Sequence, residues 1–266
     1  MFVYGTAWKE ERTEELVRLA LASGFRAIDT ANQRKHYVES AVGAAIAASG
    51  VPRDELFVQS KYTHEAGQDH RLPYDPRAPI GHQVQQSVAS SLEHLGTSYL
   101  DSYLLHGPSA RDRLADVDVQ AWRAMEVAHD RGLVRRIGAS NVTRAQLEEL
   151  CALARVPPAF VQNRCYARSG WDHAVRAVCR ARDIAYQGFS LLTANRSELQ
   201  RPELDEIMQR TGYTRAQVVF RFALQVGMVP LTGTSSEQHM HDDLATEHGS
   251  ALSDADVAII ERIAGG

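Results

Sequence analysis

A chain of 266 residues with a net charge of −4 and 23% charged residues has the composition of a soluble globular protein. It shows no basic stripe that would attract nucleic acid or anionic lipid, and no apolar run approaches the roughly 18 residues that span a bilayer. The start of the chain, MFVYGTAWKEER, lacks the basic flank and apolar core of a secretory signal. Its three cysteines include no C-x-x-C pair, so we expect reduced thiols and a cytoplasmic protein.

Eight short apolar runs have the length and composition of β-strands, and helical patterns separate them. The predicted strands cover residues 1–5, 25–29, 56–61, 100–107, 134–140, 159–163, 184–190 and 228–233. Residues 13–24 and 82–96 repeat apolar side chains with helical spacing, and both segments end at a glycine. Thr143 and Thr214 each begin a capping box, and residues 252–265 predict a last helix.

Strict alternation of strands and helices indicates parallel strands joined by crossover helices. Eight such units without a linker or a break in composition predict an α/β protein. Its fold would be a single (β/α)8 TIM barrel domain over residues 1–266, with an additional C-terminal helix. An open doubly wound sheet is the alternative. The first strand–helix turn has no G-x-G-x-x-G motif, and polar residues end most strands, so the barrel is favoured.

Polar residues at three neighbouring strand ends form the first candidate site, because barrel active sites lie at that face. Asp29, Lys61 and His106 end the second, third and fourth strands, and Tyr37 is predicted at the start of the helix after the second strand. An ammonium held by a carboxylate should lower the pKa of a nearby phenol from about 10. A neutral imidazole can orient a carbonyl oxygen. The set therefore suits the acid half of a carbonyl reduction.

Ordered fragments along the whole chain carry a family resemblance. They read GFRAIDTA, VESAVGAAI, LFVQSK, SLEHLGTSYLDSYLLHGP, IGASN, FVQNRCY, GFSLL and GTSSEQHM. In this order and spacing, the sequence resembles the aldo-keto reductases. The resemblance implies reduction of an aldehyde or ketone, with NADPH as cofactor and NADH as the alternative. It also implies a catalytic tetrad of Asp29, Tyr37, Lys61 and His106.

The resemblance assigns a cofactor site as well. Ser140, Asn141 and Gln162 would bind the nicotinamide carboxamide, and Phe189 would stack on the ring. The loop over residues 190–195 would lie against the pyrophosphate, and the last barrel loop would meet the adenosine. The remaining cofactor contacts implied are Ser190, Leu191, Thr193, Asn195, Gly233, Thr234, Ser235, His239 and Asp243.

The stretch DTANQRKHY leaves two candidates for the proton donor. In the commonest family pattern the tyrosine comes five residues after the aspartate, and this chain has Arg34 there. The segment is two residues longer than in that pattern, and alignment on the following helix places His36 in the tyrosine position. Tyr37 is the only phenol in the segment, so it is the predicted acid, with His36 as the alternative.

The longest connection, from Tyr62 to Ile80, is predicted to be a lid or a binding loop, because βα loops usually have two to six residues. Substrate contacts are expected from Trp8, Tyr62 and Tyr74. Relative to the family pattern, the sequence lacks an N-terminal hairpin and a long C-terminal loop. We therefore expect an open pocket, covered mainly by the connection, that accepts a bulky small-molecule carbonyl compound or a broad range of such compounds.

The adenosine loop departs from the family pattern of NADPH-preferring members. Gly233 and His239 occupy positions where those members commonly carry a lysine and an arginine. Backbone amides with Thr234, Ser235 and His239 could still hold a phosphate, so a weakened preference for NADPH is expected. The run from His239 to Asp243 has metal-ligand residue types, but neighbours two apart on a helix diverge, and we expect no metal.

Two other functional classes stay open at this point. One is a cofactor-binding barrel that acts as a regulatory subunit without turnover. The other is a non-redox lyase or cyclase that uses Tyr37 and Lys61 as acid and base. The sequence does not specify the oligomeric state.

Overall fold

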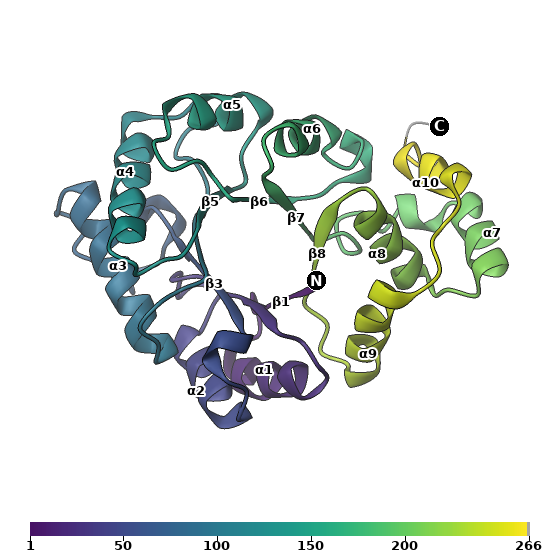
Figure 1. The fold of residues 1–266 in the computed structure, drawn as a ribbon, viewed down its shortest axis with the longest axis horizontal. Helices are drawn as coiled ribbons and strands as arrows, with labels where there is room; N and C mark the ends of the chain where they lie inside the picture. Colours follow the sequence, from purple (N-terminus) through teal and green to yellow (C-terminus); the bar gives the residue numbers. More distant parts are fainter. Residues whose placement is uncertain (265–266) are drawn as a thin grey trace.

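The computed structural model describes residues 1–264, and eight parallel strands close into a barrel at its centre (Figure 1). The strands are β1 (Val3–Gly5), β2 (Ala27–Asp29), β3 (Phe57–Tyr62), β4 (Ser102–Leu105), β5 (Ile137–Ser140), β6 (Phe160–Arg164), β7 (Ala185–Phe189) and β8 (Met228–Thr232). They follow one another around the ring in chain order, and β8 pairs with β1 through Leu231 and Val3. All eight predicted strands are confirmed, and the closing pair excludes the open sheet.

Helices surround the ring of strands in Figure 1. They are α1 (Thr13–Ala22), α2 (Glu39–Ser49), α3 (Ile80–Leu95), α4 (Asp116–Asp130), α5 (Arg144–Leu153), α6 (His173–Ala181), α7 (Pro202–Thr211), α8 (Arg215–Gln225), α9 (Glu237–Ala245) and α10 (Asp254–Glu261). The predicted capping boxes are confirmed, because the Thr143 and Thr214 side chains accept hydrogen bonds from the amides of Gln146 and Gln217. The predicted last helix corresponds to α10; the end of its predicted range, Gly265, lies outside the described residues.

One predicted boundary is wrong at the candidate site. Helix α2 begins at Glu39, so Tyr37 precedes the helix instead of starting it. The backbone amides of His36 and Tyr37 both donate to the carbonyl of Gln33, which folds the segment after β2 into a turn. The residues before Glu39 therefore form a turn ahead of the helix.

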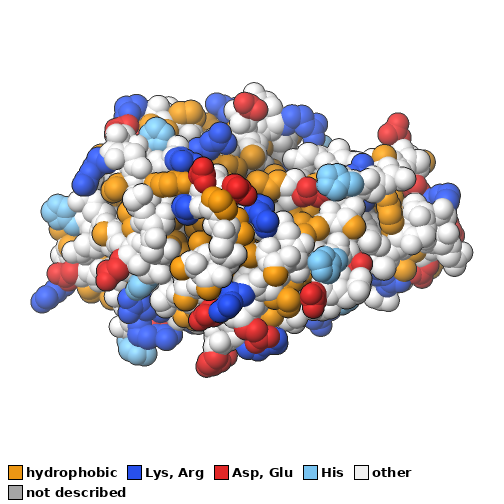
Figure 2. All heavy atoms as spheres, turned by 60° about the horizontal axis from the view of Figure 1, so that its bottom comes forward, with side chains coloured by type: hydrophobic (Ala, Val, Ile, Leu, Met, Phe, Trp, Pro, Cys, Tyr) orange, Lys and Arg blue, Asp and Glu red, His pale blue; other side chains and the backbone are white. Residues whose placement is uncertain are grey.

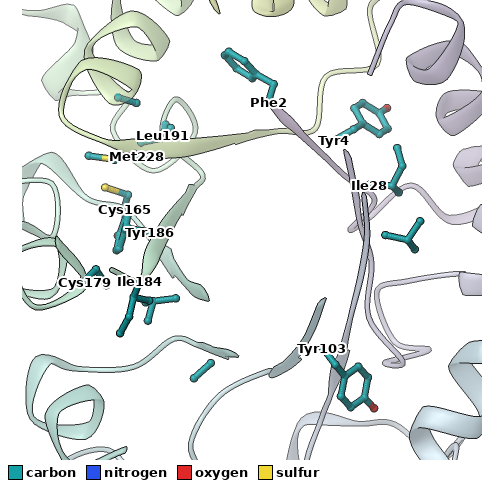
Figure 3. Packing of buried hydrophobic residues seen from close by; sticks show 14 of the residues in the cluster. Phe2, Tyr4, Ile28, Tyr103, Cys165, Cys179, Ile184, Tyr186, Leu191 and Met228 are labelled. Atoms are coloured by element: carbon teal, nitrogen blue, oxygen red, sulfur yellow. The ribbon is translucent and has the colours of Figure 1, made fainter. Parts of the chain in front are cut away.

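The hydrophobic core lies between the strands and the helices. Tyr4, Ile28 and Tyr103 point outward from the ring of strands on one side, and Tyr186 does so on the other (Figure 3). Trp122 of α4 is fully buried in the same core. Burial of each large apolar side chain contributes about 1.5–3 kcal/mol, so this layer fixes the helices against the barrel.

The inside of the barrel changes from apolar to polar along the strands. Alternate residues of a strand face the same side, so Phe57, Gln59 and Lys61 of β3 point inward at successive levels. Phe57 packs against a small inner cluster that includes Val3 and Leu231. The polar levels lie toward the C-terminal ends of the strands and thereby place the candidate site at that face.

Two properties of the described residues bear on the expected environment of the protein. None of the helices formed by residues 1–264 is long and apolar enough to cross a membrane. Cys151, Cys165 and Cys179 are free thiols, and burial raises the pKa of Cys165 and of Cys179 to about 12.

Candidate active site

A buried ion pair joins the ends of β2 and β3. The Lys61 ammonium lies 2.7 Å from both carboxylate oxygens of Asp29 and donates a third hydrogen bond to the carbonyl of Thr30. Lys61 has no exposed surface. Its burial lowers the pKa of the ammonium, and the charge of Asp29 opposes that shift. The lysine is therefore fixed in position by three acceptors at the level of the predicted site.

Tyr37 and His106 lie next to this pair. The ammonium of Lys61 is 5.4 Å from the centre of the Tyr37 ring. The rings of Tyr37 and His106 meet edge to face, with their centres 5.9 Å apart. The structure thus brings together all four residues of the predicted tetrad, although they come from four separate segments of the chain.

The pKa of Tyr37 departs from the prediction. Burial raises the pKa of the phenol above its ordinary value of 10, and the negative charge of Asp29 raises it further. From the sequence we expected Lys61 to lower the pKa of Tyr37. Lys61 is already neutralised by Asp29, so removal of the phenol from water dominates in the protein alone.

His106 is a neutral side chain in this arrangement. Burial lowers its pKa from 6.5 to about 3, and the positive charge of Lys61 acts in the same direction. Its Nδ1 atom lies 2.6 Å from the hydroxyl of Thr63. A neutral imidazole can donate one hydrogen bond from its other ring nitrogen, as orientation of a carbonyl oxygen requires.

The alternative acid, His36, has different surroundings. Its ring stacks on the indole of Trp8 with 3.5 Å between ring centres, and the Trp8 amide donates to the His36 carbonyl. The Trp8 side chain is 69% exposed at this edge of the site. The geometry favours Tyr37 as the acid, because only Tyr37 packs against both Lys61 and His106.

Asp29, Tyr37 and His106, but not the fully buried Lys61, line one end of a cavity of about 870 Å³ at the C-terminal face of the barrel. The cavity continues past β5, β6 and β7 to the start of α9. The predicted residues that line it are Trp8, Asp29, Tyr37, His106, Ser140, Asn141, Gln162, Phe189, Ser190, Leu191, Thr193, Gly233, Thr234, His239 and Asp243. Outside the cavity, basic and acidic side chains are interspersed over the face drawn in Figure 2, with apolar side chains between them.

Two predicted substrate contacts are not at the cavity. Tyr62 is fully buried and donates to the Gln83 side chain, and the Tyr74 hydroxyl donates to the carbonyl of Thr63 at 2.7 Å. None of the residues from 62 to 80 lines the cavity. The Gln33 side chain donates to the Gly67 carbonyl, and the Gln68 side chain donates to the Asn32 carbonyl, which holds this connection against the segment after β2. In this structure the connection packs beside the barrel rim, and its predicted role as a lid or a binding loop stays a prediction.

Asn195 and Ser235 also lie away from the cavity surface. The amide of Asn195 donates to the carbonyls of Cys165 and Leu191, and its oxygen accepts from the backbone amide of Ala167. Asn195 is completely buried, so its polar atoms shape the loop over residues 190–195 from behind. We therefore do not retain Asn195 as a direct cofactor contact.

A network of glutamines supports the Asp29 carboxylate and was not predicted. The amides of Gln59 and Gln162 donate to Asp29 Oδ1 at 2.7 Å and 2.9 Å. Both also donate to the side-chain oxygen of Gln187, which lies across the barrel from Gln59 and on the strand next to Gln162. The signal in the sequence was a glutamine at the third position of each of the strands β3, β6 and β7. Gln162 belongs to this network and lines the cavity as well.

The rest of the cavity has a donor set that fits a phosphate-containing dinucleotide. Ser190, Thr193 and Thr234 present hydroxyl groups, and Ser190 has a left-handed backbone with φ of 56°. Arg164 and Arg215 also line the cavity, and the sequence-based prediction missed both. Guanidinium and hydroxyl groups are suitable donors to phosphate oxygens. The residues present therefore fit a nicotinamide dinucleotide.

Comparison with known proteins decides the family. Residues 3–264 match the sequence model of the Aldo/keto reductase family. The chain belongs to this family. As an aldo/keto reductase it is an oxidoreductase that uses a nicotinamide cofactor.

Similar proteins cover most of this aldo/keto reductase. A protein named aldo-keto reductase from Mycobacterium avium (strain 104) is 35% identical over 236 residues, which are 88% of this chain and 76% of that protein. A glyoxal reductase from Bacillus subtilis (strain 168) is 32% identical over 227 residues, covering 85% and 74% of the two chains.

Solved structures show the same fold. The aldo/keto reductase from Brucella melitensis superposes with a TM-score of 0.83 at 26% identity, over 98% of this chain and 94% of that one. A Bombyx mori aldo-keto reductase, solved in complex with NADP, has a TM-score of 0.83 at 24% identity, over 98% and 88% of the two chains.

Proposed function

We propose that this aldo/keto reductase reduces an aldehyde or a ketone to an alcohol and that Tyr37 donates the proton. The observation that carries the proposal is the position of the Tyr37 ring, between Lys61 and His106 at one end of the cavity. When bound, the nicotinamide cofactor supplies the hydride that adds to the carbonyl carbon. Ser140, Asn141 and the other predicted contacts that line the cavity would hold it.

The protein groups act on the carbonyl oxygen. His106 donates a hydrogen bond that orients the oxygen, because its imidazole is neutral at physiological pH. The raised pKa keeps Tyr37 protonated, so a phenolic proton is available as negative charge develops on the oxygen. The proton moves to that oxygen, and Lys61 stabilises the phenolate that remains. Asp29 and the glutamine network hold Lys61 in place.

The mouth of the site should bind the rest of the substrate. Trp8 and His36 present a stacked aromatic surface there, and both line the cavity. Their exposed faces can cover an apolar or planar substituent and exclude water from the reacting carbonyl. This pair takes the place that the sequence-based prediction gave to the connection between Tyr62 and Ile80.

NADPH is the proposed cofactor, with weaker discrimination against NADH than cationic adenosine loops provide. Arg215, Thr234 and His239 line the adenosine end of the cavity and can donate to a 2′-phosphate. Asp242 and Asp243 line the same end and oppose a second negative charge there. Burial raises the pKa of Asp243 to about 6, so it is mostly ionised at neutral pH.

The test is cofactor oxidation, followed by nicotinamide absorbance, against a panel of aldehydes and ketones with NADPH and NADH in parallel. The proposal expects oxidation that depends on the carbonyl compound and yields equal amounts of alcohol. Tight cofactor binding without turnover on any substrate would favour the regulatory subunit instead. Product formed without net cofactor consumption would favour the lyase or cyclase.

A further inference from the structure

We propose that Thr63 is a positioning residue that fixes neutral His106 in the tautomer with its proton on Nε2. Thr63 comes directly after β3, which ends at Tyr62. The effect of this tautomer on the orientation of a substrate carbonyl rests on the proposed function. The tautomer itself follows from hydrogen bonding in the protein alone.

The contact between the two side chains is short, and its Thr63 end is buried. Thr63 Oγ1 and His106 Nδ1 are 2.6 Å apart, and Thr63 is 5% exposed. Within residues 1–264, this ring nitrogen is the one side-chain or backbone partner of the Thr63 hydroxyl. The hydroxyl hydrogen therefore has a single acceptor within reach.

The direction of this hydrogen bond sets the tautomer. A neutral imidazole has one nitrogen that donates and one that accepts, and a hydroxyl carries one hydrogen. If Nδ1 carried the proton, Thr63 would accept it, and the Thr63 hydrogen would be buried without an acceptor. Native structures avoid such unsatisfied buried groups. Thr63 consequently donates to Nδ1, and the imidazole proton is placed on Nε2.

Nε2 is the ring nitrogen that can donate a hydrogen bond into the cavity. His106 lines the cavity, and its Nδ1 is turned toward Thr63. The remaining ring nitrogen, Nε2, is therefore the one that can donate into the cavity, which the Tyr37 ring also lines. The opposite tautomer would present an acceptor and repel that oxygen.

Hydrogen bonds to their backbone groups hold both His106 and Thr63 in place. The His106 amide donates to the Tyr62 carbonyl, and Asn141 donates to the His106 carbonyl at 2.8 Å. The Thr63 carbonyl accepts from the hydroxyl of Tyr74 at 2.7 Å. The connection from Tyr62 to Ile80 therefore anchors Thr63 through Tyr74, although the connection itself does not reach the cavity.

Gly67 adds a steric argument for the same placement. A Cβ atom at Gly67 would lie 2.8 Å from the Thr63 Cγ2 methyl, closer than real Cβ atoms approach. The absence of a side chain at Gly67 thus lets the connection pack directly on Thr63. The threonine is held through its carbonyl and its methyl group, while its hydroxyl faces His106.

Histidine 15N chemical shifts in the uniformly labelled protein without cofactor test the tautomer. The chain has 11 histidines, so the His106 signals are assigned by their loss in His106→Gln. At neutral pH we expect a hydrogen-bonded, unprotonated Nδ1 and a protonated Nε2. A protonated Nδ1 would overturn the proposal, and this readout does not depend on whether the protein reduces carbonyl compounds.

Three variants test the consequence for turnover. Thr63→Val keeps the shape, removes the hydroxyl and should lower kcat about tenfold, the factor that corresponds to one ordinary hydrogen bond. Cofactor affinity should stay unchanged, and Thr63→Ser should restore both kcat and the wild-type Nδ1 signal. Thr13→Val is the matched control, because Thr13 is also buried and its hydroxyl donates to the Glu10 carbonyl away from the cavity.

Equal kcat losses in Thr63→Val and Thr13→Val, or a Thr63→Ser variant as slow as Thr63→Val, would show that the hydroxyl does not act through His106. If Thr63→Val does not fold, the wild-type shifts still decide the tautomer. Absence of carbonyl reduction by the wild type would contradict the proposed function while leaving the tautomer result intact.

Discussion

Asp29→Asn should destabilise the protein by about 3–5 kcal/mol, the usual cost of removing one partner from a buried ion pair. Lys61 has no exposed surface and both of its Asp29 contacts are 2.7 Å, so no water replaces the lost charge. The asparagine nitrogen would also face a donor in either orientation. It would meet Lys61 alone in the Oδ2 position, and Lys61 with Gln59 and Gln162 in the Oδ1 position. The structure therefore places this substitution at the upper end of the range.

The penalty should depend on pH in a defined direction. Burial already lowers the pKa of Lys61, and Asp29 is the main group that raises it. Without Asp29, the folded-state pKa falls further below the ordinary value of 10.5, while the unfolded-state pKa stays there. Between these two values the unfolded chain binds more protons, so the stability of Asp29→Asn should rise with pH.

The assay is urea unfolding of wild type, Asp29→Asn, Lys61→Met and the double variant at neutral pH and at a pH near 9. The double variant should be more stable than the sum of the single losses predicts, by at least about 1 kcal/mol. Losses that add within about 0.5 kcal/mol, or a stable Asp29→Asn, would refute the ion-pair argument. In turnover assays Lys61→Met should lose more activity than Asp29→Asn, because only Lys61→Met removes the amine beside Tyr37.

Three further predictions concern other parts of the site. The folded-state pKa of His106 is about 3, so the free energy of unfolding should fall as the pH decreases from 6.5 toward 3, by up to about 1.4 kcal/mol per pH unit. His106→Gln should flatten this part of a curve of unfolding free energy against pH. Trp8→Ala should raise KM for aromatic aldehydes, while the thermal midpoint changes little because the indole is exposed; an unchanged KM would remove Trp8 from the substrate site. His239→Arg should tighten NADPH about tenfold or more and leave NADH nearly unchanged, as measured by fluorescence quenching, whereas equal gains would show that His239 does not meet the 2′-phosphate.

The strand order and the proximity of Asp29, Lys61 and His106 were predictable because both depend on local patterns. Each strand is a short apolar run, and a barrel of parallel strands must bring its strand ends together. Asp29, Lys61 and His106 end three consecutive strands, so chain order alone made them neighbours. The closure of β1 on β8 then follows from the count of eight units.

The features that were missed depend on contacts between distant segments. The length of the connection from Tyr62 to Ile80 predicted a lid or a binding loop, and its position beside the barrel rim is set by tethers such as Tyr74 to the Thr63 carbonyl. The pKa of Tyr37 rises because burial outweighs a lysine that Asp29 already neutralises, and burial is not readable from one segment. The convergence of Gln59 and Gln187 across the barrel likewise requires the closed ring.

Tyr37→Phe provides the most direct test of the central claim, which is proton donation by Tyr37 to a substrate carbonyl. The measurement is the single-turnover rate of cofactor oxidation by an aldehyde, with cofactor binding measured separately, for wild type, Tyr37→Phe and His36→Ala. We predict that Tyr37→Phe loses about 100-fold or more in rate with cofactor affinity intact, and that His36→Ala retains most of its rate. Near-normal turnover in Tyr37→Phe together with a large loss in His36→Ala would contradict the account and assign the acid to His36.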